Sequence, residues 1–298
     1  MESFARASPM LKPPHLARRF AQTPAAVAGS LLTGMVVLVA IFDRRIAPGF
    51  AFAVSLPDRL EAPSERHLMG TDQLGRDLFT SVIQGAHTSI VIVAGVVVIA
   101  TGIGLCAGVM AGFRGGLVDD AVMRVVDVVQ SVPRFFLVVL AAGSLGDGVR
   151  PVTIVLGLTS WPLLARIVRA ETLSLREQGF VAAARALGAS NRRIILRHIV
   201  PNVAPSAFVV AALTGSRVVL LEAGLAFLGL VDPNTPSWGA LLNNAEPYLA
   251  RAWWMSVFPG GAVVLAVLGL NLLSDGLRHV VDPAVSARRR GPVGGHHR

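Results

Sequence analysis

The chain has 298 residues, of which 53% are hydrophobic and 15% charged, with a mean hydropathy of +0.62 and a formal net charge of +9. Soluble domains carry about 25% charged residues, so this composition excludes an ordinary soluble domain and indicates a membrane protein. No glycine-rich turn precedes the single lysine, Lys12, which excludes ATP hydrolysis through a P-loop. The lone cysteine excludes an intrachain disulfide, and we expect neither catalytic residues nor a metal site.

Apolar runs of about 20 residues predict helices that cross the membrane. Six such runs predict an all-α, polytopic membrane protein with six transmembrane helices. The first run, 24–42, is followed by charged residues and not by a cleavage site, so we expect an uncleaved anchor. The other five runs are 89–111, 121–145, 152–167, 206–230 and 255–273.

Basic residues concentrate in alternate loops, and cytoplasmic loops carry the excess of arginine and lysine. Segments on the side of the N-terminus hold 17 of the 27 basic residues, and segments on the other side hold 7. We therefore expect both termini in the cytoplasm. The predicted parts are a cytoplasmic segment 1–23, an extracytoplasmic loop 43–88, a core of five helices over 89–273 with a cytoplasmic loop 166–205, and a cytoplasmic tail 274–298. The arginines of this tail are expected to meet membrane lipid and not nucleic acid.

Charged residues inside the predicted spans are expensive and usually face protein or a water-filled path. Arg124 and Asp127 are three residues apart, so they are expected to pair. Arg217 and Glu222 are five residues apart, about 140° around a helix, so one is expected to face the pathway and the other a partner subunit. Pro133 is expected to kink the third span.

The most informative segment is the long basic loop 166–205. Residues 180–187 predict a short alanine-rich helix, followed by a left-handed cap at Gly188 and a helix start at Ser190. A second, basic helix is expected to end near Pro201. A helix face made of methyl groups can approach another surface closely, so this segment is expected either to dock on a partner protein or to lie on the lipid surface.

The extracytoplasmic stretch 67–77 is expected to form a turn, because Gly70 and Gly75 tolerate unusual backbone angles. Thr71 or Asp72 is expected to cap the helix that follows. A contact of Asp72 with Arg76, or of Arg76 with Asp77, is expected to hold the turn, and this structural role is favoured over contact with substrate.

The loop 166–205 resembles the EAA loop of the membrane subunits of binding-protein-dependent ABC importers, which reads EAA, three residues, Gly, nine residues, then I-x-L-P. Ala183 and Ala184 match the two alanines, Gly188 matches the glycine, and Pro201 matches the proline. Ala182 replaces the glutamate of that pattern, and a histidine, His198, stands in place of its isoleucine. The shape of the motif is retained, while a salt bridge from the missing carboxylate is not expected.

Three further stretches resemble the second permease subunit of dipeptide, oligopeptide and nickel importers, the DppC/OppC type. Residues 67–77 are similar to its H-x-x-G-T-D-x-x-G-R-D signature. Residues 222–230 are similar to its E-A-x-L-S-F-L-G-L-G segment, in which Val231 replaces the last glycine. Residues 236–239 are similar to the end of its P-P-x-P-S-W-G segment, in which Asp232 and Pro233 stand in place of a proline pair. Three motifs in this order make a chance match improbable.

The resemblance implies the type I ABC importer permease fold and a subunit that forms half of a pathway for di- or oligopeptides. Nickel or another small solute is the alternative substrate, and an ATP-independent secondary transporter is the alternative function. The implied partners are a second permease subunit in a heterodimer, two ATP-binding subunits that carry the ATP and Mg²⁺, and an extracytoplasmic substrate-binding protein, all at a bacterial inner membrane.

The residues expected to carry these roles fall into three groups. The ATPase-coupling group is Phe180, Ala182, Ala183, Ala184, Arg185, Leu187, Gly188, Arg192 and Pro201; the extracytoplasmic group is Gly70, Thr71, Asp72, Gly75, Arg76 and Asp77; the pathway or subunit-interface group is Arg217, Glu222, Pro236 and Trp238.

Overall fold

The computed structural model describes residues 20–145, 148–230 and 235–281. Within these ranges the chain is helical, and its one β-type contact is an isolated bridge. The long helices are α2 (Pro24–Ile41), α4 (Leu78–Arg114), α5 (Gly116–Ser131), α6 (Arg134–Leu145), α7 (Val149–Ser160), α8 (Pro162–Arg176), α11 (Val200–Phe227) and α13 (Trp254–Val281). The short elements are α3 (Asp43–Ile46), η1 (Leu56–Asp58), α9 (Gly179–Ala186), α10 (Asn191–Ile194), η2 (Ile195–Ile199), α12 (Trp238–Ala245) and η3 (Glu246–Tyr248).

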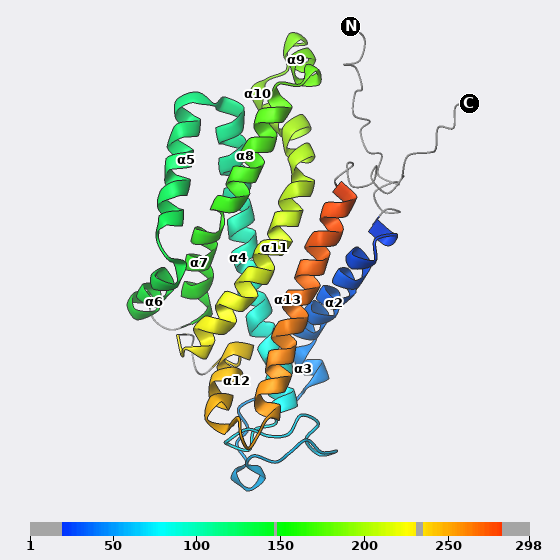
Figure 1. The fold of residues 1–298 in the computed structure, drawn as a ribbon, viewed down its shortest axis with the longest axis vertical. Coiled ribbons are helices and arrows are strands. Elements are labelled where there is room, and N and C mark those ends of the chain that lie inside the picture. The colour runs from blue at the N-terminus through cyan, green and yellow to red at the C-terminus, as the bar shows by residue number, and fades with distance from the viewer. Residues whose placement is uncertain (1–19, 146–147, 231–234, 282–298) are drawn as a thin grey trace, which may run out of the picture.

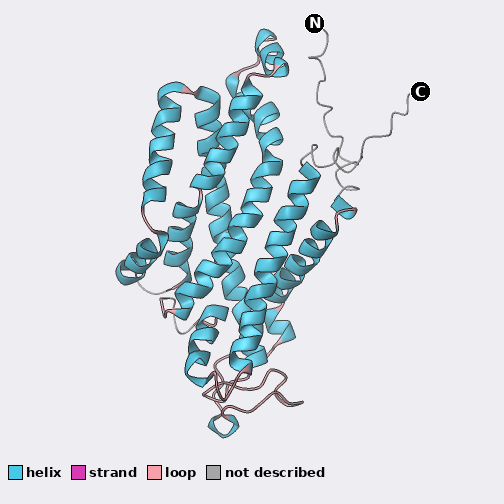
Figure 2. Cartoon of the chain, in the orientation of Figure 1, coloured by secondary structure: helices cyan, strands magenta, loops and turns pink. Residues whose placement is uncertain are grey.

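The long helices form one elongated bundle (Figures 1 and 2). Helix α4 lies at its centre and packs on α8, α7 and α11, while α13 packs on α2 and α11. One end of the bundle carries α9 and α10, together with the start of α2 and the end of α13 (Figure 1). The opposite end carries α12 and the loop between α3 and α4. The all-α prediction is confirmed.

Five helical segments of the described chain are long and apolar enough to cross a membrane. They are Pro24–Ile41, Leu78–Arg114, Val149–Arg176, Asn191–Phe227 and Trp254–Val280. The predicted third span, 121–145, is divided into α5 and α6 at Val132 and Pro133, so the predicted kink is present. A proline lacks the N–H that would continue the hydrogen-bond ladder, which explains the break.

One predicted helix end is wrong, and one helix is longer than its apolar run. Helix α4 contains the predicted run 89–111 but begins at Leu78, so its 37 residues extend well beyond a hydrocarbon core of about 30 Å. The basic helix expected to end near Pro201 continues instead as α11. The π-helical turn η2 precedes Pro201, and this wider turn lets the helix absorb prolines without ending.

Helices α2 and α13 approach each other closely because small residues line their contact. A Cβ atom at Gly29 would collide with the backbone of Leu272 and Leu273, and one at Gly276 would collide with Ala26. Such small residues are typical of helix contacts in membranes, where close backbone approach provides the van der Waals packing.

Two ion pairs fasten α5 to α8. Asp119 accepts hydrogen bonds from Arg169, and Asp127 accepts one of 2.5 Å from Arg166. The predicted pairing of Arg124 with Asp127 is therefore wrong: the partner of Asp127 comes from the neighbouring helix and not from the next turn of its own.

Candidate functional site

The short helix α9 projects from one end of the bundle and exposes most of its surface (Figure 1). Ala182, Ala183 and Ala186 are exposed, and Leu187, which follows the last turn, is 88% exposed. Only Val181 is fully buried. The predicted methyl-faced helix is present, and its alanine surface is open to a partner.

Three side-chain contacts hold α9 against the bundle. Val181 belongs to an apolar cluster that includes residues of α4, α8, η2 and α11. The guanidinium of Arg185 lies 5.5 Å from the centre of the Phe113 ring, at the last turn of α4. The rings of Phe180 and His198 lie with their centres 6.0 Å apart. A displacement of α9 would therefore act on α4 and on the start of α11 directly.

The chain leaves α9 through a left-handed turn at Gly188, whose φ is +80°. The Ala189 N–H donates to the Ala184 carbonyl, and the Gly188 N–H donates to the Arg185 carbonyl. These two bonds form a Schellman motif, as the glycine led us to expect. Ser190 then accepts a hydrogen bond from the Arg193 N–H and starts α10, so the predicted cap is also confirmed.

Gly188→Ala is expected to destabilise this turn by about 1 kcal/mol, because an alanine resists a positive φ. The matched control is Gly179→Ala: a Cβ meets open space at both positions, but Gly179 has no positive φ. Hydrogen exchange of the amides in 184–190 measures the effect. Equal exchange in the two variants would contradict this account of the turn.

Two members of the predicted coupling group lie apart from α9. Arg192 is exposed on α10, near the tip of the projecting segment. Pro201 lies in the first turn of α11, nine residues or about 14 Å further along the continuous helix. The structure thus gathers Phe180 to Arg192 at one tip and leaves Pro201 in the helix below it.

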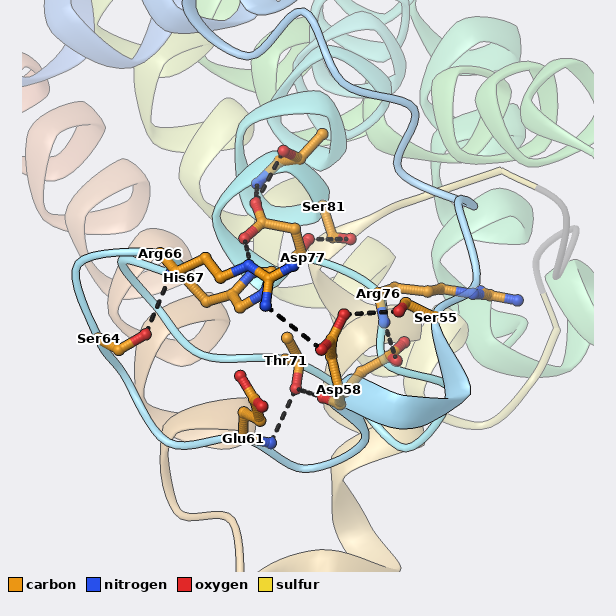
Figure 3. A network of polar contacts seen from close by, with 12 residues as sticks. Ser55, Asp58, Glu61, Ser64, Arg66, His67, Thr71, Arg76, Asp77 and Ser81 are labelled. Atoms are coloured by element: carbon orange, nitrogen blue, oxygen red, sulfur yellow. Dashed lines mark hydrogen bonds and ion pairs between the residues drawn. The ribbon is translucent and has the colours of Figure 1, made fainter.

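The opposite end of the bundle holds the 67–77 motif as a compact polar network (Figure 3). The Thr71 hydroxyl donates to the Asp58 carbonyl at 2.5 Å and accepts from the Glu61 N–H at 2.8 Å. Asp72 is buried, and one of its carboxylate oxygens accepts from the N–H groups of Leu74 and Arg76. Thr71 and Asp72 therefore fix the turn through backbone groups.

Asp77, and neither Thr71 nor Asp72, caps α4, which corrects the sequence prediction. Its carboxylate accepts from the N–H and the hydroxyl of Thr80, each at 2.8 Å, and contacts His67 Nδ1 at 3.0 Å. The Arg76 guanidinium stacks over the Phe52 ring at 5.1 Å. The predicted Asp72–Arg76 contact exists, but through the Arg76 backbone.

A tryptophan joins this network to the bundle. The indole N–H of Trp254, at the start of α13, donates to the Thr71 carbonyl at 3.0 Å. Gly70 has a φ of +76° and lies against the same indole ring, so a side chain at Gly70 would collide with it. These two contacts attach the 67–77 turn to the start of α13.

Asp72→Ala is expected to lower the free energy of unfolding by about 1–2 kcal/mol, because two N–H groups lose their acceptor. Asp72→Asn is the matched control, since its amide oxygen can still accept both hydrogen bonds. Thermal unfolding of the detergent-solubilised chain measures the difference. A melting temperature for Asp72→Ala equal to that of Asp72→Asn would contradict this role.

The four residues expected at a pathway or subunit interface occupy different environments. Arg217 is exposed on α11, as that role requires. Glu222 is 0% exposed and Trp238 2% exposed, so both are buried in the chain's own core and do not fit the expected role. The Trp238 indole N–H donates to the Val82 carbonyl at 3.0 Å and docks α12 on α4. Pro236 is partly buried just before α12.

The contacts that anchor α9 were missed at the level of sequence. Phe113 lies 72 residues before Arg185, and no spacing rule connects them. His198 gave a usable signal, because it departs from the isoleucine of the motif, and the structure brings its ring against Phe180. His198, which differs from the family motif, is therefore a residue that contacts α9.

A family model described as "Binding-protein-dependent transport system inner membrane component" matches residues 104–287. The chain is 38% identical over 293 residues to the glutathione transport system permease protein GsiD of Escherichia coli O157:H7, covering 95% of this chain and 97% of the relative. It is also 38% identical over 270 residues to a protein of Brucella suis named as a peptide permease, covering 90% and 89% of the two chains.

A solved structure titled as an inward-facing conformation of the MetNI methionine ABC transporter has a similar fold. The TM-score is 0.55 at 20% identity, and the match covers 68% of this chain and 97% of the other. This likeness supports the type I ABC importer permease fold predicted from sequence. Together with the family match over most of the chain, it establishes that the chain is a member of the family of inner membrane components of binding-protein-dependent transport systems.

Proposed function

We propose that this chain forms half of the pathway by which di- or oligopeptides enter a bacterial cell, and that separate subunits hydrolyse the ATP that drives uptake. The observation that carries the proposal is α9, which has an exposed alanine face and is anchored to α4 through Arg185 and to η2 through Phe180. The names of the relatives, a peptide permease and a glutathione permease, support a peptide as the substrate. ATP and Mg²⁺ belong on the partner chains.

Helix α9 is the element that receives the motion of the ATP-binding subunits. When those subunits close, α9 moves with them, and its contacts transmit the displacement to the long helices. Val181 acts on the cluster between α8 and α11, while Arg185 acts on the end of α4. Since packed cores respond as rigid bodies, the helices shift together and the pathway changes the side to which it opens.

The α9 end of the bundle is the cytoplasmic end. Segments predicted to be cytoplasmic hold 17 of the 27 basic residues, as the positive-inside rule requires. The start of α2 and the end of α13 lie at this same end (Figure 1), which supports two cytoplasmic termini. The 67–77 network then lies outside, where a substrate-binding protein delivers its cargo.

The working importer contains two permease subunits, two ATP-binding subunits and one binding protein. This chain pairs with a second permease subunit, and each permease receives one ATP-binding subunit on its projecting helix. The 67–77 network offers the binding protein a rigid surface, because its turn is fixed by backbone hydrogen bonds and by Trp254.

The test is co-purification and uptake with the tagged chain. We expect the full chain to bring down an ATP-binding subunit and a second permease, and the assembly to accumulate labelled dipeptide in proteoliposomes only with ATP and binding protein. Deletion of 179–187 should abolish ATPase binding while the variant still inserts in the membrane.

Three results would contradict the proposal. Retained ATPase binding after the deletion would show that α9 is not the docking element. Uptake by the chain alone under an ion gradient would favour a secondary transporter. Uptake of nickel but not of peptide by the assembly would refute the substrate.

A further inference from the structure

Helix α2 lies at the edge of the bundle and has two different faces (Figure 1). Its inner face packs on α13 and α4, and Gly29, Val36 and Ala40 are buried there. Its outer face is apolar and exposed, with Leu31 69% exposed and Leu38 55% exposed. The described part of the chain therefore leaves the outer face of α2 open to the membrane.

This outer face carries an open groove of about 490 Å³. The apolar side chains of Met35, Leu38 and Phe42 line it. Gly34 lies among them, and a Cβ atom at this position would meet nothing within 4 Å. Packing on α13 explains Gly29, whose Cβ would collide with the backbone of α13, but it does not explain Gly34. The missing side chain of Gly34 helps to open the groove.

The groove has the length of one membrane leaflet. Its lining within α2 runs from Ser30 to Phe42, about 18 Å along the axis, which is little more than half of a hydrocarbon core of about 30 Å. An acyl chain occupies one leaflet, whereas a helix of a neighbouring subunit would cross both. A volume of about 490 Å³ over this length is also much narrower than an α-helix, which is about 10 Å wide with its side chains. The groove therefore fits an acyl chain better than a helix.

Two arginines lie at one end of the groove. Arg44 and Arg45 belong to α3, directly after the span of α2, so they lie at the level of the lipid headgroups. Both are exposed, and the Arg45 guanidinium lies 5.6 Å from the centre of the Phe42 ring. Within the described ranges no carboxylate forms an ion pair with either arginine. Asp43 accepts a hydrogen bond of 2.7 Å from the Arg44 backbone N–H, and the one aspartate and two arginines leave α3 with a positive charge.

The two arginines are carried on a fixed element. The Ala47 N–H donates to the Asp43 carbonyl at 2.8 Å and closes α3. The side-chain amide of Gln84, on α4, donates to the carbonyls of Ala47 at 3.2 Å and of Gly49 at 2.7 Å. Because these contacts attach the end of α3 to α4, the charges of Arg44 and Arg45 stay beside the groove.

We propose that α2 and α3 bind an anionic phospholipid in the leaflet furthest from α9, with one acyl chain in the groove and the headgroup phosphate on Arg44 and Arg45. Arginine suits a phosphate because its planar fork presents paired N–H donors. An anionic lipid is favoured over a zwitterionic one, since the ammonium of a zwitterionic headgroup would meet two positive charges. The ligand is a membrane component, so the inference does not depend on the transported substrate.

The test compares two photoreactive lipids. The tagged chain, with the subunits that co-purify with it, is placed in phosphatidylcholine nanodiscs that contain a trace of phosphatidylglycerol or phosphatidylcholine with a diazirine on one acyl chain. Mass spectrometry after illumination measures the labelling of residues 30–42. We expect phosphatidylglycerol to label this segment about fivefold more than phosphatidylcholine, because arginines near the membrane surface attract anionic lipid.

Two variants separate the headgroup contact from the acyl-chain contact. Arg44→Gln/Arg45→Gln should remove the preference for phosphatidylglycerol. The matched control, Arg59→Gln/Arg251→Gln, removes two exposed arginines from loops at the same end of the bundle and should retain the preference. Gly34→Leu should fill the groove and lower the labelling by both lipids. Its melting temperature should not fall, because a side chain at Gly34 meets open space.

Four results would overturn the inference. The first is equal labelling of 30–42 by the two lipids in the unmodified protein, and the second is a preference that persists in Arg44→Gln/Arg45→Gln. The third is unchanged labelling in Gly34→Leu, which would place the acyl chain elsewhere. The fourth is labelling of 30–42 by neither lipid when the second permease is present, which would mean that this subunit covers the groove.

Discussion

Replacing Ala183 with tryptophan is expected to abolish ATP-driven uptake while the permease remains folded in the membrane. Ala183 is exposed on α9, and its methyl group contributes to the face that lets a partner approach closely. An indole at this position would hold the ATP-binding subunit several ångströms away and remove the packing that transmits motion. The measurement is co-purification of the ATP-binding subunit, together with ATPase activity stimulated by the binding protein.

The matched control is Ala250→Trp, the same change at an exposed position of the opposite end of the bundle. It should leave ATPase binding intact. Both variants should show unchanged thermal unfolding, because neither side chain is buried. Normal ATPase binding and uptake by Ala183→Trp would refute α9 as the docking surface, and a fall in the melting temperature would show that Ala183 packs inside the chain.

The spans of the bundle were predictable because each is a long apolar run, while their ends were not. Helix α4 continues outward to Leu78 because Asp77 supplies a cap, and the sequence also offered Thr71 and Asp72 as caps. The choice depends on Gly70 and Gly75, which direct Thr71 and Asp72 into the turn. Helix ends are thus set by the loop that precedes them.

The effect of a proline on a helix was also not predictable from the neighbouring residues alone. Pro133 breaks its span, whereas Pro201 and Pro205 lie within a continuous helix. The difference arises from context: η2 widens the helix before Pro201, and Val203 and Ala207 are buried in the cluster below α9. The burial of these residues stabilises the helix beyond what local propensity predicts.

The local part of the candidate site was predictable and the tertiary part was not. The alanine face, Gly188 and Ser190 follow from neighbouring residues, and the structure confirms the helix, its C-terminal turn and the following cap. The contacts of α9 with Phe113 and His198 join residues that are distant in sequence. A local spacing rule also paired Asp127 with the wrong arginine.

Glu222→Lys is expected to prevent stable folding, whereas Glu222→Gln is expected to fold and transport normally. Glu222 is 0% exposed, and neither carboxyl oxygen has a hydrogen bond of ordinary geometry; the hydroxyls of Ser89 and Ser237 lie beside it. An unpaired charge in such a site costs several kcal/mol, and the longer lysine side chain would also overfill it. The glutamine keeps the shape and can share hydrogen bonds with the two hydroxyls.

The yield of membrane-inserted protein and its thermal unfolding measure the folding defect of Glu222→Lys. ATP-driven uptake measures transport by Glu222→Gln. Because Glu222 of α11 is buried beside Ser89 of α4 and Ser237 at the start of α12, a side chain that does not fit there should separate these helices. A Glu222→Lys variant as stable as the parent would mean that water reaches the site. A Glu222→Gln variant that folds but transports nothing would mean that the carboxyl group acts in the transport cycle.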